Sequence, residues 1–174
     1  MGNNKLSKKF IALFGANVLL VVACLVAFWQ YSEAERQFTE AYKAQYNSYL
    51  LADELRQSSD DLTRLGRTYV ITADSSYEEQ YFDILDIRNG KKPRPEEYHR
   101  IYWDFVAATG RAPRGNGQTI SLQDLMKEAG FSEEEFGYLT EAQNNSDGLV
   151  GLEVKAMNAV KGKFEDGSGG YSKT

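Results

Sequence analysis

Cysteine and histidine are almost absent from this sequence. Its 174 residues include one cysteine, Cys24, and one histidine, His99. A single cysteine excludes a disulfide within the chain and any zinc site built from several thiolates, and one histidine cannot form a His-rich metal site. We therefore expect neither a bound metal nor a cofactor, and we expect His99 to be partly buried.

Recognisable catalytic motifs are also lacking. The sequence contains no G-x-S-x-G, no P-loop, no dinucleotide fingerprint and no H-E-x-x-H. Asp60 and Asp61 would point in different directions on a helix, and the acidic run 133–135 opens a helix, where negative charge is favourable. We expect that the protein is not an enzyme. The net charge of −5 also argues against a general affinity for nucleic acid.

Charged residues are missing from one long stretch near the N-terminus. Residues 11–29 read IALFGANVLLVVACLVAFW, and the only polar amide among them is Asn17. A helix of this length rises about 28 Å, close to the roughly 30 Å hydrocarbon core of a bilayer. Lysines precede the stretch and glutamates follow it, and the positive side of a membrane segment normally stays in the cytoplasm. We predict residues 1–10 in the cytoplasm, a transmembrane helix at 11–29 surrounded by lipid, and residues 30–174 outside.

A signal peptide, a lipoprotein signal and a buried core helix each fit the apolar stretch less well. A cleaved signal peptide would have a shorter apolar run and a small-residue cleavage site. Val21 to Cys24 loosely resemble a lipoprotein signal, but Leu25 to Trp29 continue the apolar run beyond the cysteine. A buried core helix would need apolar surroundings that the remaining sequence does not supply. An uncleaved membrane anchor is therefore the prediction.

Proline is absent between Ser32 and Thr72, and Gly66 is the only glycine there. Small and apolar residues recur at steps of mostly three and four, which is typical of a helix in a coiled coil or bundle. They are Ala34, Ala41, Ala44, Ser48, Leu51, Leu55, Ser58, Leu62, Leu65 and Tyr69. Charged residues, Glu54 among them, are assigned to the opposite face. We predict that the membrane helix continues outward as a rod of roughly 60 residues, about 90 Å long.

The remaining sequence predicts shorter helices separated by turn signals. We expect helices at 77–89 after a Ser76–Glu79 capping box, at 96–108, from Ser121 to 128, and from a second capping box at Ser132 and Glu135 onward. Residues 91–95 form a stiff basic connector, and a loop follows Gly162. No strand is expected. The predicted fold class is all-α: an N-terminal transmembrane helix that continues into a long helix of an extracytoplasmic helical bundle, incomplete at the C-terminus.

Two segments show a family resemblance. SSDDLTRLGRTYVITADSSYEEQYFDILDIRNGKKPRPEEYHRIYWDFV and ISLQDLMKEAGFSEEEFGYLTEAQNNSDGLVGLEVKAMNAVKG together cover roughly residues 58–162. They resemble the N-terminal sensor region of bacterial methyl-accepting chemotaxis proteins. The resemblance implies an inner-membrane receptor with a periplasmic helical domain that binds a small ligand, works as a homodimer and passes a helix movement across the membrane. The second transmembrane helix, the HAMP relay and the cytoplasmic signalling module of such receptors have no counterpart in this sequence.

Two rival functions stay open at this point. The same kind of input domain precedes sensor histidine kinases and diguanylate cyclases. A non-sensory single-pass scaffold protein would also present a helical bundle on a membrane anchor. A HAMP-like segment downstream would favour a receptor, whereas a stop soon after residue 174 would favour the scaffold.

The candidate ligand site combines basic and aromatic residues. Guanidinium groups bind carboxylates with two parallel hydrogen bonds, and aromatic rings can form the walls of a pocket and accept cations. The candidate residues are Arg64, Arg67, Tyr69, Arg88, Tyr98, Arg100 and Trp103. The alternative is that these arginines pair with nearby aspartates while the aromatic side chains pack in the core. The connector residues Lys91, Lys92 and Arg94 are expected to be a solvated basic loop.

Overall fold

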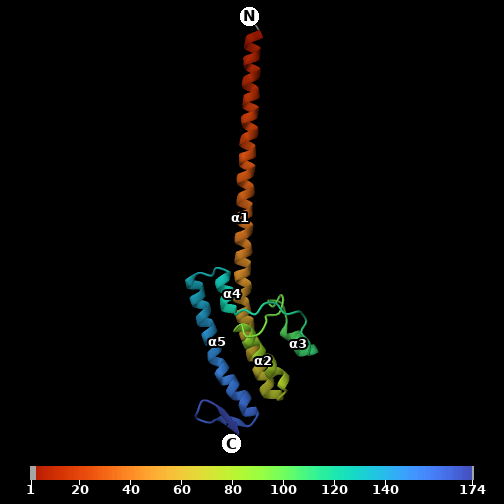
Figure 1. The fold of residues 1–174 in the computed structure, drawn as a ribbon, viewed down its shortest axis with the longest axis vertical. Coiled ribbons are helices and arrows are strands. Elements are labelled where there is room, and N and C mark those ends of the chain that lie inside the picture. Colours follow the sequence, from red (N-terminus) through yellow and green to blue (C-terminus); the bar gives the residue numbers. More distant parts are fainter. Residues whose placement is uncertain (1–2, 174) are drawn as a thin grey trace. The chain divides into compact units, whose positions relative to one another are not determined.

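A computed structural model describes residues 3–173 of the chain, and side chains from Ser7 onward (Figure 1). Its first element, α1, is a 70-residue helix at Asn3–Thr72. The helix has no proline and only two glycines in its length, and most of its residues have high helix propensity. The chain divides into two compact units, one ending at Gln45 and the other beginning at Tyr46, so α1 starts in the first and ends in the second.

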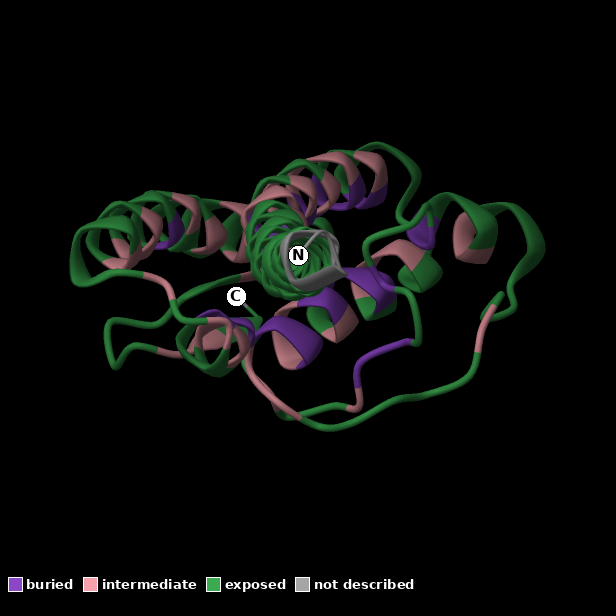
Figure 2. Ribbon diagram, turned by 90° about the horizontal axis from the view of Figure 1, so that it is seen from above, coloured by how far each residue is buried: buried purple, intermediate pink, exposed green. Residues whose placement is uncertain are grey.

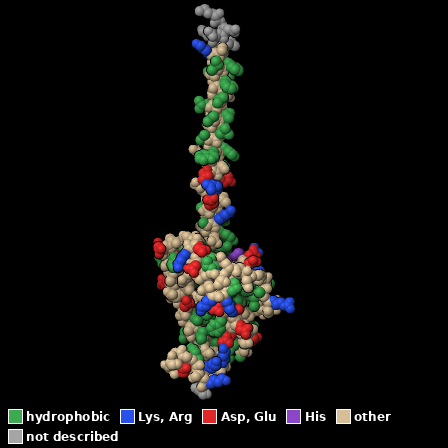
Figure 3. Space-filling model, viewed as in Figure 1, with side chains coloured by type: hydrophobic (Ala, Val, Ile, Leu, Met, Phe, Trp, Pro, Cys, Tyr) green, Lys and Arg blue, Asp and Glu red, His purple; other side chains and the backbone are tan. Residues whose placement is uncertain are grey.

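The first unit contains the apolar stretch. An 18-residue window of α1 has a mean hydropathy of 2.7, and none of this window is buried. Among the described residues, α1 is the one helix long and apolar enough to cross a membrane. Figure 3 shows apolar side chains along this part of the helix. Phe14, Leu19 and Phe28 are among the exposed ones. Asn17 donates its side-chain amide to the Leu13 carbonyl at 2.9 Å, so the one polar side chain there is hydrogen-bonded within the helix.

The second unit has two apolar clusters that share α1. The first joins α1 to α2 (Ser75–Arg88), to residues around Trp103 and to α5 (Glu133–Val160). The second joins α1 to α4 (Leu122–Glu128). Figure 2 marks the buried positions, all of which lie in the second unit among the described residues. The predicted stripe is confirmed from Leu51 onward, where its members are buried: Leu51, Leu55, Ser58, Leu62, Leu65 and Tyr69. Ser48 is only partly buried.

A reversal of the chain separates α1 from α2. Ala73 adopts a left-handed backbone with φ of 56°, and Asp74 caps α2 by accepting from the Ser76 amide at 2.9 Å. The predicted capping box of Ser76 and Glu79 is therefore wrong, because the capping residue is Asp74, two residues before Ser76. Asp74 and Ser76 are both good capping residues, and the tight turn at Ala73 places the Asp74 side chain beside the Ser76 amide, one of the free amides in the first turn of α2.

The connector after α2 does not lead directly into a helix. Pro95 forms an antiparallel bridge with Asn116, and the Glu96 amide donates to the Gly115 carbonyl at 2.9 Å. Glu97 has a left-handed backbone with φ of 49°, which interrupts any helix starting there. The predicted helix at 96–108 is thus shorter than expected, and α3 spans only Trp103–Thr109.

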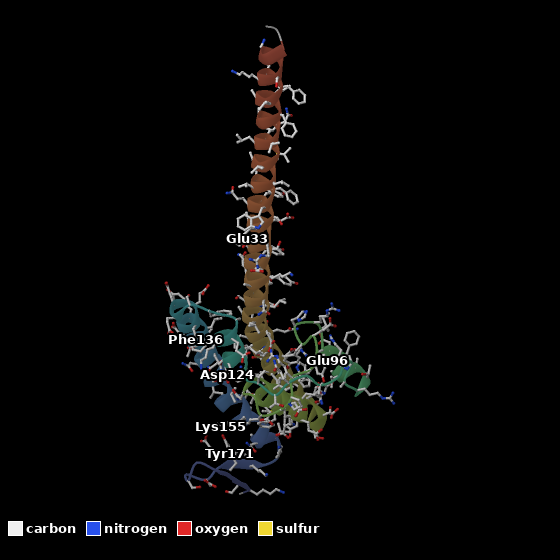
Figure 4. The ribbon with its side chains drawn as sticks, turned by 45° about the horizontal axis from the view of Figure 1, so that its top comes forward. Glu33, Glu96, Asp124, Phe136, Lys155 and Tyr171 are labelled. Carbon is white, nitrogen blue, oxygen red and sulfur yellow. The ribbon has the colours of Figure 1, made fainter. Side chains whose placement is uncertain are left out.

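The start of α4 lies directly over the end of α2. Gly90 has a φ of 70°, and a β-carbon built on it would lie 2.6 Å from the Ser121 amide nitrogen. Only glycine fits there, because the φ disfavours a side chain and the neighbouring atoms are backbone. Ser121 itself caps α4 by accepting from the Asp124 amide at 3.0 Å, as predicted. Asp124 is labelled in Figure 4.

The start of the last helix agrees with the prediction from the sequence, whereas the residues after that helix do not. The capping box of Ser132 and Glu135 opens α5, as predicted. The segment after Gly162 is not a loop throughout, because β1 (Lys163–Glu165) pairs antiparallel with β2 (Tyr171–Lys173). Asp166 organises the turn between them by accepting from the amides of Ser168 and Gly170. This hairpin is a small addition to a fold that is all-α in class, as predicted.

Candidate functional site

The second unit contains a cavity of about 380 Å³ beside α1, which we call the α1 cavity. Its size lies within the range of small-molecule sites. One wall comes from α1 and another from residues 94–99, a segment that contains the Glu96 labelled in Figure 4. The rest comes from the loop before α4 and from α4 itself. The lining residues are Asn47, Leu50, Leu51, Glu54, Arg94, Pro95, Glu97, Tyr98, His99, Gly117, Gln118 and Leu125.

A buried ion pair lies in the wall of the α1 cavity. The Arg94 guanidinium donates to the Glu54 carboxylate, and their side chains are 10% and 7% exposed. Burial raises the pKa of Glu54, and the attraction of Arg94 opposes this rise without cancelling it. Removing either charge of such a buried pair is strongly destabilising, because no water is present to solvate the charge that remains. Nη1 of Arg94 has no hydrogen-bond partner among the described residues.

The ion pair continues into an aromatic network. The Arg94 guanidinium lies 5.5 Å from the ring centroid of Tyr98, and the Tyr98 hydroxyl accepts from Nε1 of Trp103 at 2.7 Å. Burial raises the pKa of Tyr98, so its hydroxyl stays protonated at neutral pH. A void of about 10 Å³ lies beside these rings, with Asp61 and Arg100 also in its wall. It has room for one water molecule.

A second cavity, which we call the α2 cavity, also measures about 380 Å³. One side of α2 forms its first wall, and α3 with the connector and the 110–116 loop form the others. The lining residues are Ser76, Glu79, Gln80, Asp83, Ile87, Lys92, Pro93, Pro95, Tyr102, Trp103, Val106, Gly110, Ala112 and Asn116. Pro95 lines both cavities, so the connector separates them.

The seven residues proposed from the sequence do not form one site. Tyr98, Arg100 and Trp103 surround the small void. Arg64 lies near it, because its guanidinium pairs with Asp61 at 2.7 Å, and Asp61 lines the void.

The other three predicted residues lie elsewhere. Arg67 is exposed and Tyr69 is 3% exposed within the core. Arg88 is buried and pairs with Asp147 of α5. The pairing of arginines with nearby aspartates that the sequence allowed as an alternative is present for Arg64, which pairs with Asp61 and Asp104, but Arg88 pairs with a distant aspartate that the sequence did not suggest.

Two residues of the site were assigned wrongly from the sequence. Glu54 was placed on the charged face of α1, but it is 6% exposed. Arg94 was expected in a solvated loop, but it is 8% exposed. A signal for Glu54 was present, since it adjoins Leu55 and lies three residues after Leu51 in the apolar stripe. His99 is exposed rather than partly buried.

Both cavities are suited to noncovalent binding of a small molecule. They offer charged groups, amides and aromatic walls. No group of three or more potential metal-ligating side chains occurs within the described part of the chain. Comparison with protein-family models, with curated proteins and with solved structures finds no match to this chain.

Proposed function

We propose that this chain is the sensory input region of a bacterial transmembrane chemotaxis receptor. It binds a small molecule on the periplasmic side of the inner membrane and transmits a helix movement across that membrane. Residues 1–10 lie in the cytoplasm in this proposal, and residues 30–174 lie in the periplasm. The same input region would serve a histidine kinase or a diguanylate cyclase, whose output modules differ.

One observation carries the proposal: α1 contains both the apolar stretch and a wall of a ligand-sized cavity. Residues 11–29 of α1 are apolar enough to span a bilayer, and Asn47, Leu50, Leu51 and Glu54 of the same helix line the α1 cavity. A ligand that binds one position of α1 better than another shifts the equilibrium between those positions. A shift or rotation of 1–2 Å is the usual scale of such movements.

The mixed lining of the α1 cavity favours sensing over scaffolding. A scaffold needs only an accessible outer surface, whereas a sensor needs a recess with oriented polar groups. The buried pair of Glu54 and Arg94 provides oriented charges in such a space. The ligand would rearrange the bonds of this pair and so act on α1 directly.

The proposed orientation is tested with a reporter enzyme. Alkaline phosphatase, which folds only outside the cytoplasm, is joined after Thr174 in one fusion and before Met1 in another. We expect activity from the first fusion and none from the second. The reverse pattern would refute the orientation.

The proposed homodimer and its signalling are tested with cysteine variants of the full chain in membranes. Cys24 is first replaced by serine, and cysteine is then placed singly at Ala34, Ala41 and Ala44, which are exposed members of the small-residue stripe. We expect a disulfide between chains at one or more positions. We also expect its rate of formation to change when a small molecule that binds the chain is added. Absence of crosslinks at all three positions would argue against the dimer, and a rate that no bound ligand alters would argue against signalling.

A further inference from the structure

The part of α1 that follows the apolar stretch carries large aromatic side chains on one side. Tyr31, Phe38 and Tyr42 are 66%, 73% and 62% exposed, and their seven- and four-residue steps bring them to the same face of the helix. Charged residues of this segment lie on the other side, where Arg36 pairs with Glu33 at 2.7 Å. A contiguous apolar face of this size on a water-facing helix is typical of an interaction surface.

The same face continues into the apolar stretch without a break. Four of its members are seven residues apart, and two more lie four positions after the last two of these. The six residues, which we call the α1 seam, are Asn17, Cys24, Tyr31 and Phe38, with Glu35 and Tyr42. Steps that alternate between three and four are the pattern of helices that pair in a left-handed coiled coil. All six residues lie within the first unit.

Asn17 is the polar member of the α1 seam inside the apolar stretch. In the part of the chain that the structure describes, its side chain makes one hydrogen bond, to the Leu13 carbonyl. Its second amide hydrogen and its own carbonyl oxygen need partners, and the hydrocarbon of a bilayer offers none. Side-chain amides in membranes hydrogen-bond to neighbouring helices for this reason. The partner of the α1 seam must therefore present a donor and an acceptor at the depth of Asn17.

A second copy of this chain meets that requirement. Two copies in one membrane have the same orientation, so their α1 helices run parallel and identical positions face each other across a two-fold axis. Asn17 then lies beside its own counterpart, which supplies a donor and an acceptor, and the aromatic rings outside the membrane cover one another. A different partner would need the same uninterrupted face from lipid into water.

The area of the aromatic face is large enough to contribute to a stable contact. Tyr31, Phe38 and Tyr42 are about two-thirds exposed. An aromatic side chain buries about 150–250 Å² in full, so covering these three rings removes roughly 300–500 Å² per chain, about half of the ~800 Å² per partner in a standard interface. The members of the α1 seam within the apolar stretch add to this area.

We infer that α1 pairs in parallel with α1 of a second copy along the α1 seam. The inference rests on the proposed homodimer and names its contact face. This face lies roughly 100° around the helix from the small-residue stripe of Ala34, Ala41 and Ala44, so the two faces can be distinguished. Glu35 is the one charged member of the α1 seam and forms no ion pair among the described residues. Its carboxylate faces its counterpart in the pair and opposes the contact.

Cys24 provides the test, because the α1 seam places it against its counterpart. The full chain in membrane vesicles is treated with iodine, a lipid-soluble oxidant. Iodine takes two electrons from two thiols as the disulfide forms, and it leaves as two iodide ions with two protons. The matched controls carry Cys24→Ser with either Val22→Cys or Ala23→Cys, which keep one thiol at nearly the same depth on other sides of α1. We expect the native chain to crosslink at least ten times faster than either control.

Substitutions outside the membrane test the rest of the α1 seam through the same Cys24 reaction. Phe38→Ser and Tyr42→Ser each remove apolar contact and should slow crosslinking at least fivefold. Tyr138→Ser, at a ring on α5 that is 66% exposed, should leave the rate within twofold. Glu35→Gln removes the repulsion and should raise the rate at least threefold, while Glu40→Gln on the charged side of α1 should leave it within twofold. All five side chains are exposed, so these variants should keep the fold.

The inference is overturned if either control crosslinks as fast as the native chain, if neither Phe38→Ser nor Tyr42→Ser slows the reaction, or if Glu40→Gln changes the rate more than Glu35→Gln. Crosslinking at Ala34, Ala41 or Ala44 with none at Cys24 would overturn the α1 seam and keep the homodimer. Crosslinking at Cys24 at a rate that no bound small molecule alters would keep the α1 seam and refute the sensory function.

Discussion

Replacing Arg94 with methionine removes the positive partner of the buried ion pair and leaves Glu54 in surroundings that disfavour its charge. Glu54 then has two options, to remain charged at high cost or to take up a proton. Taking up a proton limits the loss of stability. From the ordinary pKa of 4.5, protonation costs about 3 kcal/mol at pH 7 and less than about 1 kcal/mol at pH 5.

The lost contact between the guanidinium and the Tyr98 ring adds about 0.5–1 kcal/mol at either pH. We therefore expect Arg94→Met to lower the free energy of unfolding by about 4 kcal/mol at pH 7 and by only about 1–2 kcal/mol at pH 5. The sign follows from the pKa of Glu54, which burial raises further once Arg94 is absent. A carboxyl group with a raised pKa in the folded state loses its contribution to stability as the pH rises above the unfolded value.

The matched variant Glu54→Met should behave differently. Arginine does not release its proton in proteins, so the uncompensated guanidinium should cost about 3–5 kcal/mol at both pH values. The double variant Glu54→Met with Arg94→Met replaces the pair by apolar side chains and should recover most of the loss. The pair therefore gives a double-mutant cycle with a pH-dependent arm and a pH-independent arm.

The assay is urea unfolding of the full chain in detergent, followed by tryptophan fluorescence. The chain has two tryptophans, and Trp29→Phe leaves Trp103, next to the pair, as the only reporter. An equal loss for Arg94→Met at pH 5 and pH 7 would refute the reasoning, because Glu54 would then not be the group whose charge is stranded. A double variant no more stable than either single variant would refute it as well.

Two further predictions concern the fold. Asp74→Ala should lower the free energy of unfolding by about 1 kcal/mol, while Ser76→Ala should cost less than half of that, because the Asp74 side chain accepts from a free amide in the first turn of α2; equal losses in urea unfolding would contradict this cap. Leu62→Ala should cost about 2–5 kcal/mol because Leu62 is 2% exposed, while Leu152→Ala, at a residue that is 66% exposed, should stay within about 0.5 kcal/mol. Similar losses for the two leucines would contradict the assignment of the core.

The sequence predicted the features that depend on neighbouring residues. The three- and four-residue steps along α1 were enough to identify its buried side from Leu51 to Tyr69, because a helix repeats every 3.6 residues. The caps at Ser121 and Ser132 were predicted for the same reason, since a cap and its amide are at most three residues apart.

The sequence could not predict the features that depend on distant residues. The short α3 results from the bridge of Pro95 to Asn116 and from the left-handed Glu97, and neither is visible in local spacing. The site was only partly predicted. Tyr98 and Trp103 were identified, but Glu54 and Arg94 lie forty positions apart and become meaningful only when the fold pairs them.

Gly90 lies where the end of α2 contacts the start of α4, and this contact limits which residues the sequence can carry there. The backbone at Ser121 occupies the space that any side chain at position 90 would need. Two segments 31 positions apart in the chain are therefore in direct backbone contact there. At position 90 even a methyl group would displace the start of α4 and with it the far wall of the α1 cavity, where Leu125 lies. Variation in related chains should therefore be excluded at this one residue.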